Sequence, residues 1–348
     1  MHEFSEFKVL NYWDRVGRVL KGELPPPVTL EMDPTNACNH DCVWCIDREH
    51  RSANAGFLKR EVALSVIEQA AALGVKSIVL KGGGEPLVYP WIDELLYAAH
   101  GAGLAVGMIT NGELVRDHVQ AITECCTWLR LSVDAGSEAT HKLVHKPVRD
   151  GAYERVWEGI KQVSDKVFCG MIYIIHPDTY HEMHEGARRA REAGCKYIAF
   201  KRVVAPGEVF THEAYDEIEA SYHAARKQYS NGVFQVMGLD MYNFIEGPTK
   251  KAYKVCKAHH LVAILCANGK MYACCSTRGR ESHCFGSVYE NTLEEIWYGD
   301  KRRRILQDID DRKCAHICPG HTSFMRYDHY NKMFEYLMLD DKPHADFA

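Results

Sequence analysis

Three cysteines lie within eight residues near the start of this 348-residue chain: Cys38, Cys42 and Cys45. Their spacing, C-x3-C-x2-C, places three thiolates in one compact loop after an apolar segment. Soft thiolates select zinc, copper(I) or iron–sulfur clusters. A closed structural zinc site uses four ligands, so zinc would need His40 or His50 as the fourth. Three thiolates can instead hold three irons of a [4Fe–4S] cube and leave the fourth iron open to a reacting ligand.

A second group of cysteines lies toward the other end of the chain. Of the 14 cysteines, seven fall between residues 256 and 318, whereas residues 46–255 hold only four. Cysteines used for buried packing would be scattered along the chain. The clustering therefore predicts two separate metal centres.

The segment between the two groups alternates between strand-like and helix-like patterns. Mostly apolar strands are expected at residues 28–33, 77–80, 104–109, 128–133, 167–175 and 197–203, with helices at 60–73, 91–100 and 153–163. This alternation predicts a parallel sheet covered by helices. Periodicity alone does not separate a doubly wound sheet from an open or closed barrel. In an α/β barrel the active site lies at the carboxyl ends of the strands, where the first cysteine loop falls.

Changes in pattern divide the chain into five segments. They are an N-terminal extension ending in three prolines (1–27), the α/β unit (28–210), a helical linker (211–250), a cysteine-rich unit of short segments (251–325) and a helical tail (326–348). We expect the aromatic and methionine side chains of the tail to pack onto the α/β unit.

Composition narrows the class of protein. The formal net charge is −5, so the chain has no excess of basic residues. Nucleic-acid binding is therefore not predicted. The longest apolar run, at residues 261–267, is far shorter than the ~20 residues of a membrane span. The first residues do not resemble a secretory signal. We expect a cytoplasmic protein without a nucleic-acid or membrane partner, whose thiols are free, catalytic or bound to metal.

The first cysteine loop resembles the signature of the radical S-adenosylmethionine (SAM) superfamily. Trp44 stands where that family commonly has an aromatic residue, just before the third cysteine. The resemblance implies a [4Fe–4S] cluster held by Cys38, Cys42 and Cys45, with SAM chelating the open iron. One electron from the cluster would yield a 5′-deoxyadenosyl radical that abstracts hydrogen from the substrate. It further implies a partial (β/α)6 TIM-type barrel and an electron donor of the flavodoxin or ferredoxin type.

Polar positions after the later strands extend the resemblance. The glycine run after the second strand resembles the family's GGE motif, which would meet the SAM amino group, although it could be only a tight turn. Asp134 lies where family members contact the SAM ribose, or else caps a helix. The sixth strand carries a cation, Lys201 or Arg202, that could bind the SAM carboxylate or an anionic substrate. Alternatively, it is only a charged residue at the end of a strand. The implied SAM-binding residues are Gly83, Gly84, Glu85, Ser132, Asp134 and Arg202.

The C-terminal cysteines resemble the SPASM/twitch extensions of the same family, which bind auxiliary iron–sulfur clusters. The element Cys256-x12-Gly269-x4-Cys274 matches the pattern of these extensions. No cysteine follows Cys318, so the resemblance implies the shorter twitch form with one [4Fe–4S] cluster. Structural zinc is the alternative. The implied ligands are Cys256, Cys274, Cys314 and Cys318, and Cys275 could replace Cys274.

A fully ligated auxiliary cluster offers no open iron, so its natural role is electron transfer. Loss of an electron from the substrate radical would complete a dehydrogenation, whereas a thiol that returns hydrogen to the opposite face would complete an epimerisation. Candidate hydrogen donors are Cys266, Cys275 and Cys284. Similar enzymes of antibiotic biosynthesis act on sugars, aminocyclitols and nucleosides, so we expect a polar small-molecule substrate.

Other outcomes remain open at this point. They are radical decarboxylation of a sugar acid nucleoside and peptide modification by a SPASM maturase. A purely structural metal-binding module would not explain a loop with three thiolates instead of four. Residues near strand ends that could meet a hydroxylated substrate are His145, Tyr173, His176 and Arg202, although a single histidine at such a place is often structural.

Overall fold

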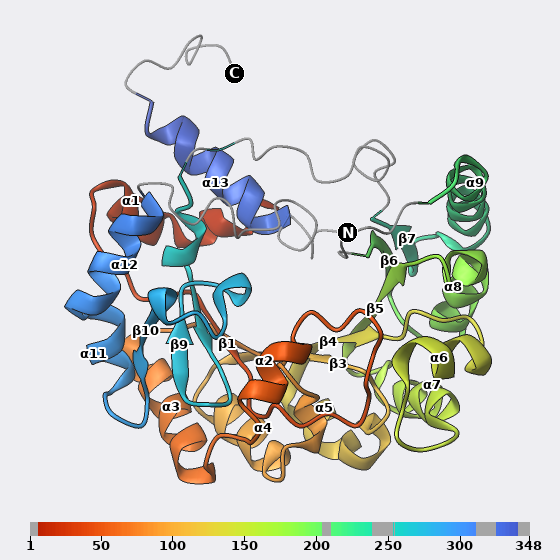
Figure 1. The fold of residues 1–348 in the computed structure, drawn as a ribbon, viewed down its shortest axis with the longest axis horizontal. Helices are drawn as coiled ribbons and strands as arrows, with labels where there is room; N and C mark the ends of the chain where they lie inside the picture. Colours follow the sequence, from red (N-terminus) through yellow and green to blue (C-terminus); the bar gives the residue numbers. More distant parts are fainter. Residues whose placement is uncertain (1–5, 204–209, 239–252, 254, 311–324, 340–348) are drawn as a thin grey trace.

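The computed structural model describes residues 6–203, 210–238, 253, 255–310 and 325–339. A ten-stranded curved sheet forms its centre, and helices cover the convex side of that sheet (Figure 1). The strand order is β10-β9-β8-β1-β2-β3-β4-β5-β6-β7. Among the helices of the described residues, none has the length and hydropathy of a membrane-spanning segment.

All six expected strands form, and each pairs in parallel with the next. They are β1 (Thr29–Met32), β2 (Ser77–Leu80), β3 (Ala105–Thr110), β4 (Cys126–Ser132), β5 (Phe168–Ile175) and β6 (Tyr197–Arg202). Short apolar runs between helices are typical of strands buried in a parallel sheet. The α/β partial-barrel fold class is thereby confirmed.

Helices connect these strands across the convex side. They are α3 (Arg60–Leu73), α4 (Ile92–Gly101), α5 (Val119–Cys125), α6 (Glu138–His145), α7 (Ala152–Val163), α8 (Met183–Glu192) and α9 (His212–Tyr229). The expected helix at 60–73 has those bounds because Gly74 takes a left-handed conformation (φ 91°) that ends it. The sequence shows no clear period for α5 and α6, whose seven and eight residues are too short, although a helix after Asp134 was one of the alternatives.

A seventh parallel strand, β7 (Gln235–Met237), pairs with β6 inside the segment expected to be a linker. Three residues carry too little pattern to reveal a strand. At the opposite edge, β8 (Val262–Leu265) pairs in parallel with β1, and β9 (Lys270–Tyr272) and β10 (Cys284–Ser287) follow it antiparallel. The cysteine-rich unit therefore continues the sheet of the α/β unit.

The two ends of the chain pack against the cysteine-rich unit. The extension forms a 3-10 helix (η2, Glu6–Tyr12) and α1 (Trp13–Leu20), and the tail forms α13 (Met325–Leu337). Phe334 shares an apolar cluster with Val16 of α1 and Leu261 just before β8. The described part of the tail therefore packs mainly on the extension and the cysteine-rich unit, with Val28 at the edge of this cluster, whereas we expected it to pack onto the α/β unit.

Side chains alternate between the two sides of the sheet. One set, such as Leu30 and Phe200, is fully buried in the core. The other set points to the concave side, away from the helix layer. Toward the carboxyl ends of the strands, the polar members of that set include Glu31, Lys81, Arg130, Ser132 and Lys201. The concave side of the barrel is therefore charged near the carboxyl ends of its strands.

Aromatic rings cover glycines on this concave side. A Cβ on Gly170 of β5 would lie 1.8 Å from Cε1 of Tyr197. We expect Gly170→Ala to lower the free energy of unfolding by about 1–3 kcal/mol, because the ring must move in a packed layer. Gly17→Ala is the control, since nothing lies within 4 Å of its new Cβ and alanine favours α1. Urea denaturation measures both, and an unchanged midpoint for Gly170→Ala would contradict the packing described.

Candidate active site

The first three cysteines lie in the loop between β1 and α2 (Arg48–Ala53). Cys38, Cys42 and Cys45 are each partly exposed, and no disulfide joins any two cysteines among the described residues. Three unpaired thiols on one loop, at the carboxyl end of a barrel strand, provide the soft donor set that an iron–sulfur cluster requires.

The glycine run after β2 packs against this loop. A Cβ on Gly84 would lie 2.0 Å from the carbonyl oxygen of Ala37, and one on Gly83 would lie 2.3 Å from Oδ1 of Asn36. The backbone N–H of Glu85 donates to Ala37 at 2.9 Å. Only glycine permits so close an approach of two backbones. The run therefore forms part of the wall beside the cysteine loop.

Glu85 is buried and joins two loops. Its carboxylate accepts hydrogen bonds from the hydroxyl of Thr110 at 2.6 Å, from the N–H of Asn111 at 2.7 Å and from the N–H of Leu87 at 3.0 Å. Burial raises the pKa of Glu85, and these donors oppose that rise. Its oxygens are thus used within the protein, where they hold the turn after β3 against the glycine run.

Replacing Glu85 by glutamine should weaken this brace. The carboxylate of Glu85 has two acceptor oxygens, whereas the amide of glutamine has only one. The NH2 group of the amide would therefore face an N–H or O–H that also donates, and that hydrogen bond would be lost. We expect the free energy of unfolding to fall by about 1.5–3 kcal/mol, the usual contribution of hydrogen bonds to a charged group. Glu68→Gln on the exposed side of α3 is the control, expected within about 0.5 kcal/mol of the parent. Equal chemical denaturation midpoints for the two variants would contradict the role of Glu85.

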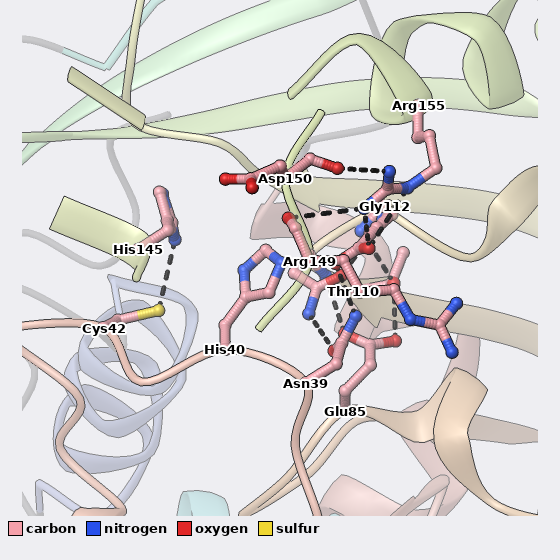
Figure 2. A network of polar contacts seen from close by, with 12 residues as sticks. Asn39, His40, Cys42, Glu85, Thr110, Gly112, His145, Arg149, Asp150 and Arg155 are labelled. Atoms are coloured by element: carbon pink, nitrogen blue, oxygen red, sulfur yellow. Dashed lines mark hydrogen bonds and ion pairs between the residues drawn. The ribbon is translucent and has the colours of Figure 1, made fainter. Parts of the chain in front are cut away.

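A chain of polar contacts reaches Cys42 through His145, and Figure 2 shows the contact between these two residues. The Sγ of Cys42 lies 3.1 Å from Nδ1 of His145, the last residue of α6. Nε2 of His145 lies 3.3 Å from Oδ2 of Asp134, and Oδ1 of Asp134 accepts the N–H of Ile174 at 2.7 Å. The imidazole of His145 therefore lies between the thiol of Cys42 and the carboxylate of Asp134.

A second imidazole approaches the same thiol. Nε2 of His40 lies 2.9 Å from Oε2 of Glu113, and Arg155 forms an ion pair with that carboxylate. Among the described residues, His40, Cys42 and His145 each place one potential metal-binding atom within 4.8 Å of the other two. Each imidazole lies beside a buried carboxylate, Glu113 for His40 and Asp134 for His145.

The three thiols differ in their electrostatic surroundings. Burial raises the pKa of Cys38 to about 12 and also raises the pKa of Cys45. Burial would raise the pKa of Cys42 as well, but His145 and His40 outweigh it and lower that pKa to about 6. For His145, burial opposes the charged form, yet Cys42 and Asp134 raise its pKa to about 10. The two imidazoles therefore favour the thiolate form of Cys42.

The structure places Asp134 differently from a helix cap. Its φ of 52° is left-handed, and Ser137 caps α6 by accepting the N–H of Thr140 at 3.2 Å. Asp134 is buried, with its carboxylate on His145. Ser132, two residues earlier, is partly exposed on the concave side.

Two residues expected near a substrate lie toward the helix layer. Tyr173 was expected near a strand end where it could contact a substrate, but it is fully buried and its hydroxyl donates to the carbonyl of Thr179 at 2.7 Å. The guanidinium of Arg202 lies 6.0 Å from the ring centroid of Phe210. Strand alternation directs Lys201 to the concave side and Arg202 away from it.

Comparison with known proteins identifies the family. Residues 32–190 match the model of the radical SAM superfamily, and residues 256–319 match that of an iron–sulfur cluster-binding domain, SPASM. The chain belongs to the radical SAM superfamily. As a radical SAM enzyme with a SPASM domain, it uses a [4Fe–4S] cluster, SAM and an auxiliary cluster.

Relatives of this radical SAM enzyme have several activities by name. A SAM-dependent nucleotide dehydratase of Flammeovirga pacifica is 31% identical over 125 residues, which cover 34% of this chain and 43% of the relative. An AdoMet-dependent heme synthase of Methanosarcina barkeri is 25% identical over 305 residues, covering 82% and 86%. The chain thus spans less than half of that dehydratase and most of that heme synthase.

Solved structures share the fold. Streptococcus suis SuiB bound to its precursor peptide SuiA has a TM-score of 0.65 at 17% identity, covering 86% of this chain and 71% of that one. The anSMEcpe protein with bound AdoMet has a TM-score of 0.63 at 15% identity, covering 90% and 92%. At these identities the similarity concerns the fold alone.

The SPASM domain contributes two of the expected auxiliary ligands to the described residues. Cys256 and Cys274 are partly exposed, and Sγ of Cys256 accepts a hydrogen bond from Nδ2 of Asn331 in α13 at 3.3 Å. Cys314 and Cys318 lie outside the described residues. The tail helix therefore contacts one of the expected cluster ligands, which the sequence did not indicate.

The three candidate hydrogen donors differ in exposure. Cys266 and Cys284 are buried at 0% and 1% exposure, and Cys284 packs in an apolar cluster. Cys275 is partly exposed, and burial raises its pKa while Lys81 and Glu31 act on it from the concave side of the barrel. Of these thiols, Cys275 alone is both near the charged concave side and accessible.

Arg278 of the SPASM domain links that domain to both ends of the cysteine loop. Its Nη1 donates to Oδ1 of Asp47 at 2.9 Å, and its Nη2 donates to Oδ1 of Asp33 at 3.1 Å. Asn268 of the same domain donates to Asn54 at 3.1 Å. The role of Arg278 could not be predicted from the sequence, because no local pattern marks a contact across 245 residues.

Proposed function

We propose that this radical SAM enzyme abstracts hydrogen from a polar small molecule of the sugar, aminocyclitol or nucleoside type and completes a dehydrogenation or an epimerisation. The observation that carries the proposal is the charged concave side of the barrel, where Glu31 pairs with Lys81 and where Arg130 and Lys201 also point. When bound, the SAM cluster and SAM supply the 5′-deoxyadenosyl radical. Charged and hydrogen-bonding groups in a concave site orient a polar ligand.

We assign the SAM cluster to Cys38, Cys42 and Cys45, which are free, partly exposed and in one loop. The auxiliary cluster is assigned to Cys256 and Cys274 together with Cys314 and Cys318. Backbone groups of Gly83 and Gly84 are proposed to bind the SAM amino group, while Glu85 holds the adjoining turn. Ser132 is proposed to contact the SAM ribose, and Asp134 is proposed to support this part of the site from two residues further along the chain. Lys201 is better directed than Arg202 toward the SAM carboxylate.

The names of the relatives support a small substrate. A nucleotide dehydratase, a heme synthase and a GTP 3′,8-cyclase are among them, the cyclase of Pelotomaculum thermopropionicum being 33% identical over 140 residues. A peptide substrate is the second candidate. It is favoured by a PqqA peptide cyclase of Ruegeria pomeroyi, 35% identical over 89 residues.

Release of 5′-deoxyadenosine tests the substrate class. Anaerobically reconstituted enzyme is reduced with dithionite and given SAM with aminocyclitols, nucleosides, sugar acid nucleosides or short peptides. We expect 5′-deoxyadenosine above the substrate-free rate with a polar small molecule. Stimulation by peptides alone would favour the maturase alternative, and carbon dioxide release would favour decarboxylation. No SAM cleavage under any reductant would overturn the assigned chemistry.

The outcome of the reaction is read in D2O. An epimerisation that uses Cys275 should place deuterium at carbon in the product, whereas a dehydrogenation lowers the product mass by two hydrogens. Cys275→Ala should then abolish deuterium incorporation but keep 5′-deoxyadenosine formation, and Cys284→Ala is the matched control. If Cys275→Ala epimerises as the parent does, Cys275 is not the donor.

We further propose a flavodoxin- or ferredoxin-type protein as the electron donor and the cytoplasm as the location. No disulfide joins cysteines in the part of the chain that the structure describes, and thiols persist in a reducing compartment. Support of SAM cleavage by a reduced flavodoxin or ferredoxin in place of dithionite checks the donor, and failure with both would contradict it.

A further inference from the structure

The turn that follows β3 contacts the middle of the cysteine loop through one carboxylate. Nδ2 of Asn39 donates to Oε2 of Glu113 at 2.8 Å, and Nε2 of His40 donates to the same oxygen at 2.9 Å. A carboxylate accepts, and a neutral imidazole can donate from Nε2, so neither contact needs a charged group in the loop. Figure 2 shows Asn39 and His40 within this polar network. One buried oxygen thus binds the two residues that follow Cys38.

The other oxygen of Glu113 has a different partner. Nε of Arg155 in α7 donates to Oε1 at 3.2 Å, and the guanidinium forms an ion pair with the carboxylate. The side chain of Glu113 is 1% exposed, so this pair compensates a charge that lies almost entirely out of contact with water. Oε1 therefore anchors Glu113 to α7, while Oε2 anchors the cysteine loop to Glu113.

A second side chain of the same turn supports Asn39. Nδ2 of Asn111 donates to Oδ1 of Asn39 at 2.8 Å, and Oδ1 of Asn111 accepts the N–H of Glu113 at 3.1 Å. The N–H of Asn111 donates in turn to the buried carboxylate of Glu85. All these contacts join groups of the protein to one another. The barrel itself therefore holds this part of the loop in place.

We propose that Glu113 is a positioning residue that fixes the cysteine loop around the SAM cluster and thereby slows loss of that cluster. Side chains that orient metal ligands contribute to metal affinity although they do not touch the metal. A loop that is already held by the barrel also loses less conformational entropy when it binds a ligand. The inference rests on the proposed assignment of Cys38, Cys42 and Cys45 to the SAM cluster.

A matched pair of substitutions tests this role. Glutamine can place its amide oxygen where Oε2 lies, whereas methionine has a similar length and no such acceptor, and both lose the ion pair with Arg155. We expect Glu113→Met to speed loss of the SAM-responsive EPR signal to an iron chelator by about tenfold, and Glu113→Gln to restore most of the parent rate. Equal rates for the two variants would overturn the inference.

Two references separate this effect from a general loss of stability. The SAM-unresponsive signal of the auxiliary cluster should decay at the parent rate in both variants, because Glu113 contacts only the first cysteine loop. Glu158→Met removes an exposed carboxylate of α7 that pairs with Arg116, and it should leave both signals at the parent rate. Equal acceleration of both signals in Glu113→Met would contradict a role specific to the SAM cluster.

A second variant keeps the inference testable if Glu113→Met does not fold. Asn39→Ala removes one donor to Oε2 and leaves the ion pair of Glu113 with Arg155 intact, so no buried charge loses its partner. We expect it to speed loss of the SAM-responsive signal by about threefold, less than Glu113→Met does, because His40 still donates. Loss at the parent rate in Asn39→Ala would count against the inference.

Failure of the ligand assignment can be told from failure of this inference. Unchanged iron in a variant that lacks Cys38, Cys42 and Cys45 would remove the assignment, and the inference with it. Loss of the SAM-responsive cluster in that variant, together with equal rates for Glu113→Met and Glu113→Gln, would defeat the inference alone.

Discussion

Replacing Cys38, Cys42 and Cys45 together by alanine should lower the iron content of anaerobically reconstituted enzyme from about eight to about four atoms per chain, the content of one remaining [4Fe–4S] cluster. SAM cleavage should be abolished, because no open iron remains to bind SAM. Iron analysis and chromatographic detection of 5′-deoxyadenosine measure the two effects.

The matched control uses cysteines that the structure buries in the core. Cys125, Cys126 and Cys195 belong to the hydrophobic core and take no part in either group of candidate ligands. Their triple alanine variant should keep both clusters and retain SAM cleavage, at some cost in stability. Unchanged iron in the first triple variant would show that the loop holds no cluster.

Arg278→Met should destabilise the enzyme by about 3–5 kcal/mol, the usual cost of removing one partner from a buried ion pair. The guanidinium is paired with Asp33 and Asp47, and Asp33 is fully buried. Without Arg278 the carboxylate of Asp33 loses its nearest compensating charge. Arg280→Met is the control, because Arg280 is exposed and such a change is expected to stay within about 0.5 kcal/mol.

The loss caused by Arg278→Met should grow with pH. Burial raises the pKa of Asp33 to about 6 even beside Arg278 and Lys81. A carboxyl whose folded pKa lies above its unfolded value binds protons more tightly in the folded state, so stability falls as pH rises between the two values. Removing Arg278 raises the folded pKa further and widens that interval. Denaturation midpoints at pH 5 and pH 8 measure the difference, and Asp33→Asn in the variant should recover part of the loss at pH 8. An equal loss at both pH values would contradict this account.

Local patterns sufficed for most of the fold. The strand at residues 77–80 and the helix at 60–73 have the bounds that the sequence predicts, because an apolar run and a glycine stop are local signals. β7 was missed because three residues carry no period. That β8 pairs with β1 could not be predicted, since an edge pairing joins segments with no shared local signal.

The site was predictable only in part. The cysteine spacing and the glycine run point to their chemistry because their residue types limit which metals and turns they can support. Tyr173 and the helical tail were misplaced because which face a side chain takes depends on neighbouring elements. The exposure that separates Cys275 from Cys266 and Cys284 likewise depends on packing.

The sequence by itself determined the metal chemistry and the order of the elements, since both are written in residue types and short spacings. Only the tertiary structure decided which groups surround those metals. His145 reaches Cys42 across 103 positions of the chain, and Arg278 reaches Asp33 across 245. The first contact arises because parallel strands bring their carboxyl ends to one edge of the sheet, whatever their separation in sequence. The second arises because β8 of the SPASM domain pairs with β1, the strand that precedes Asp33.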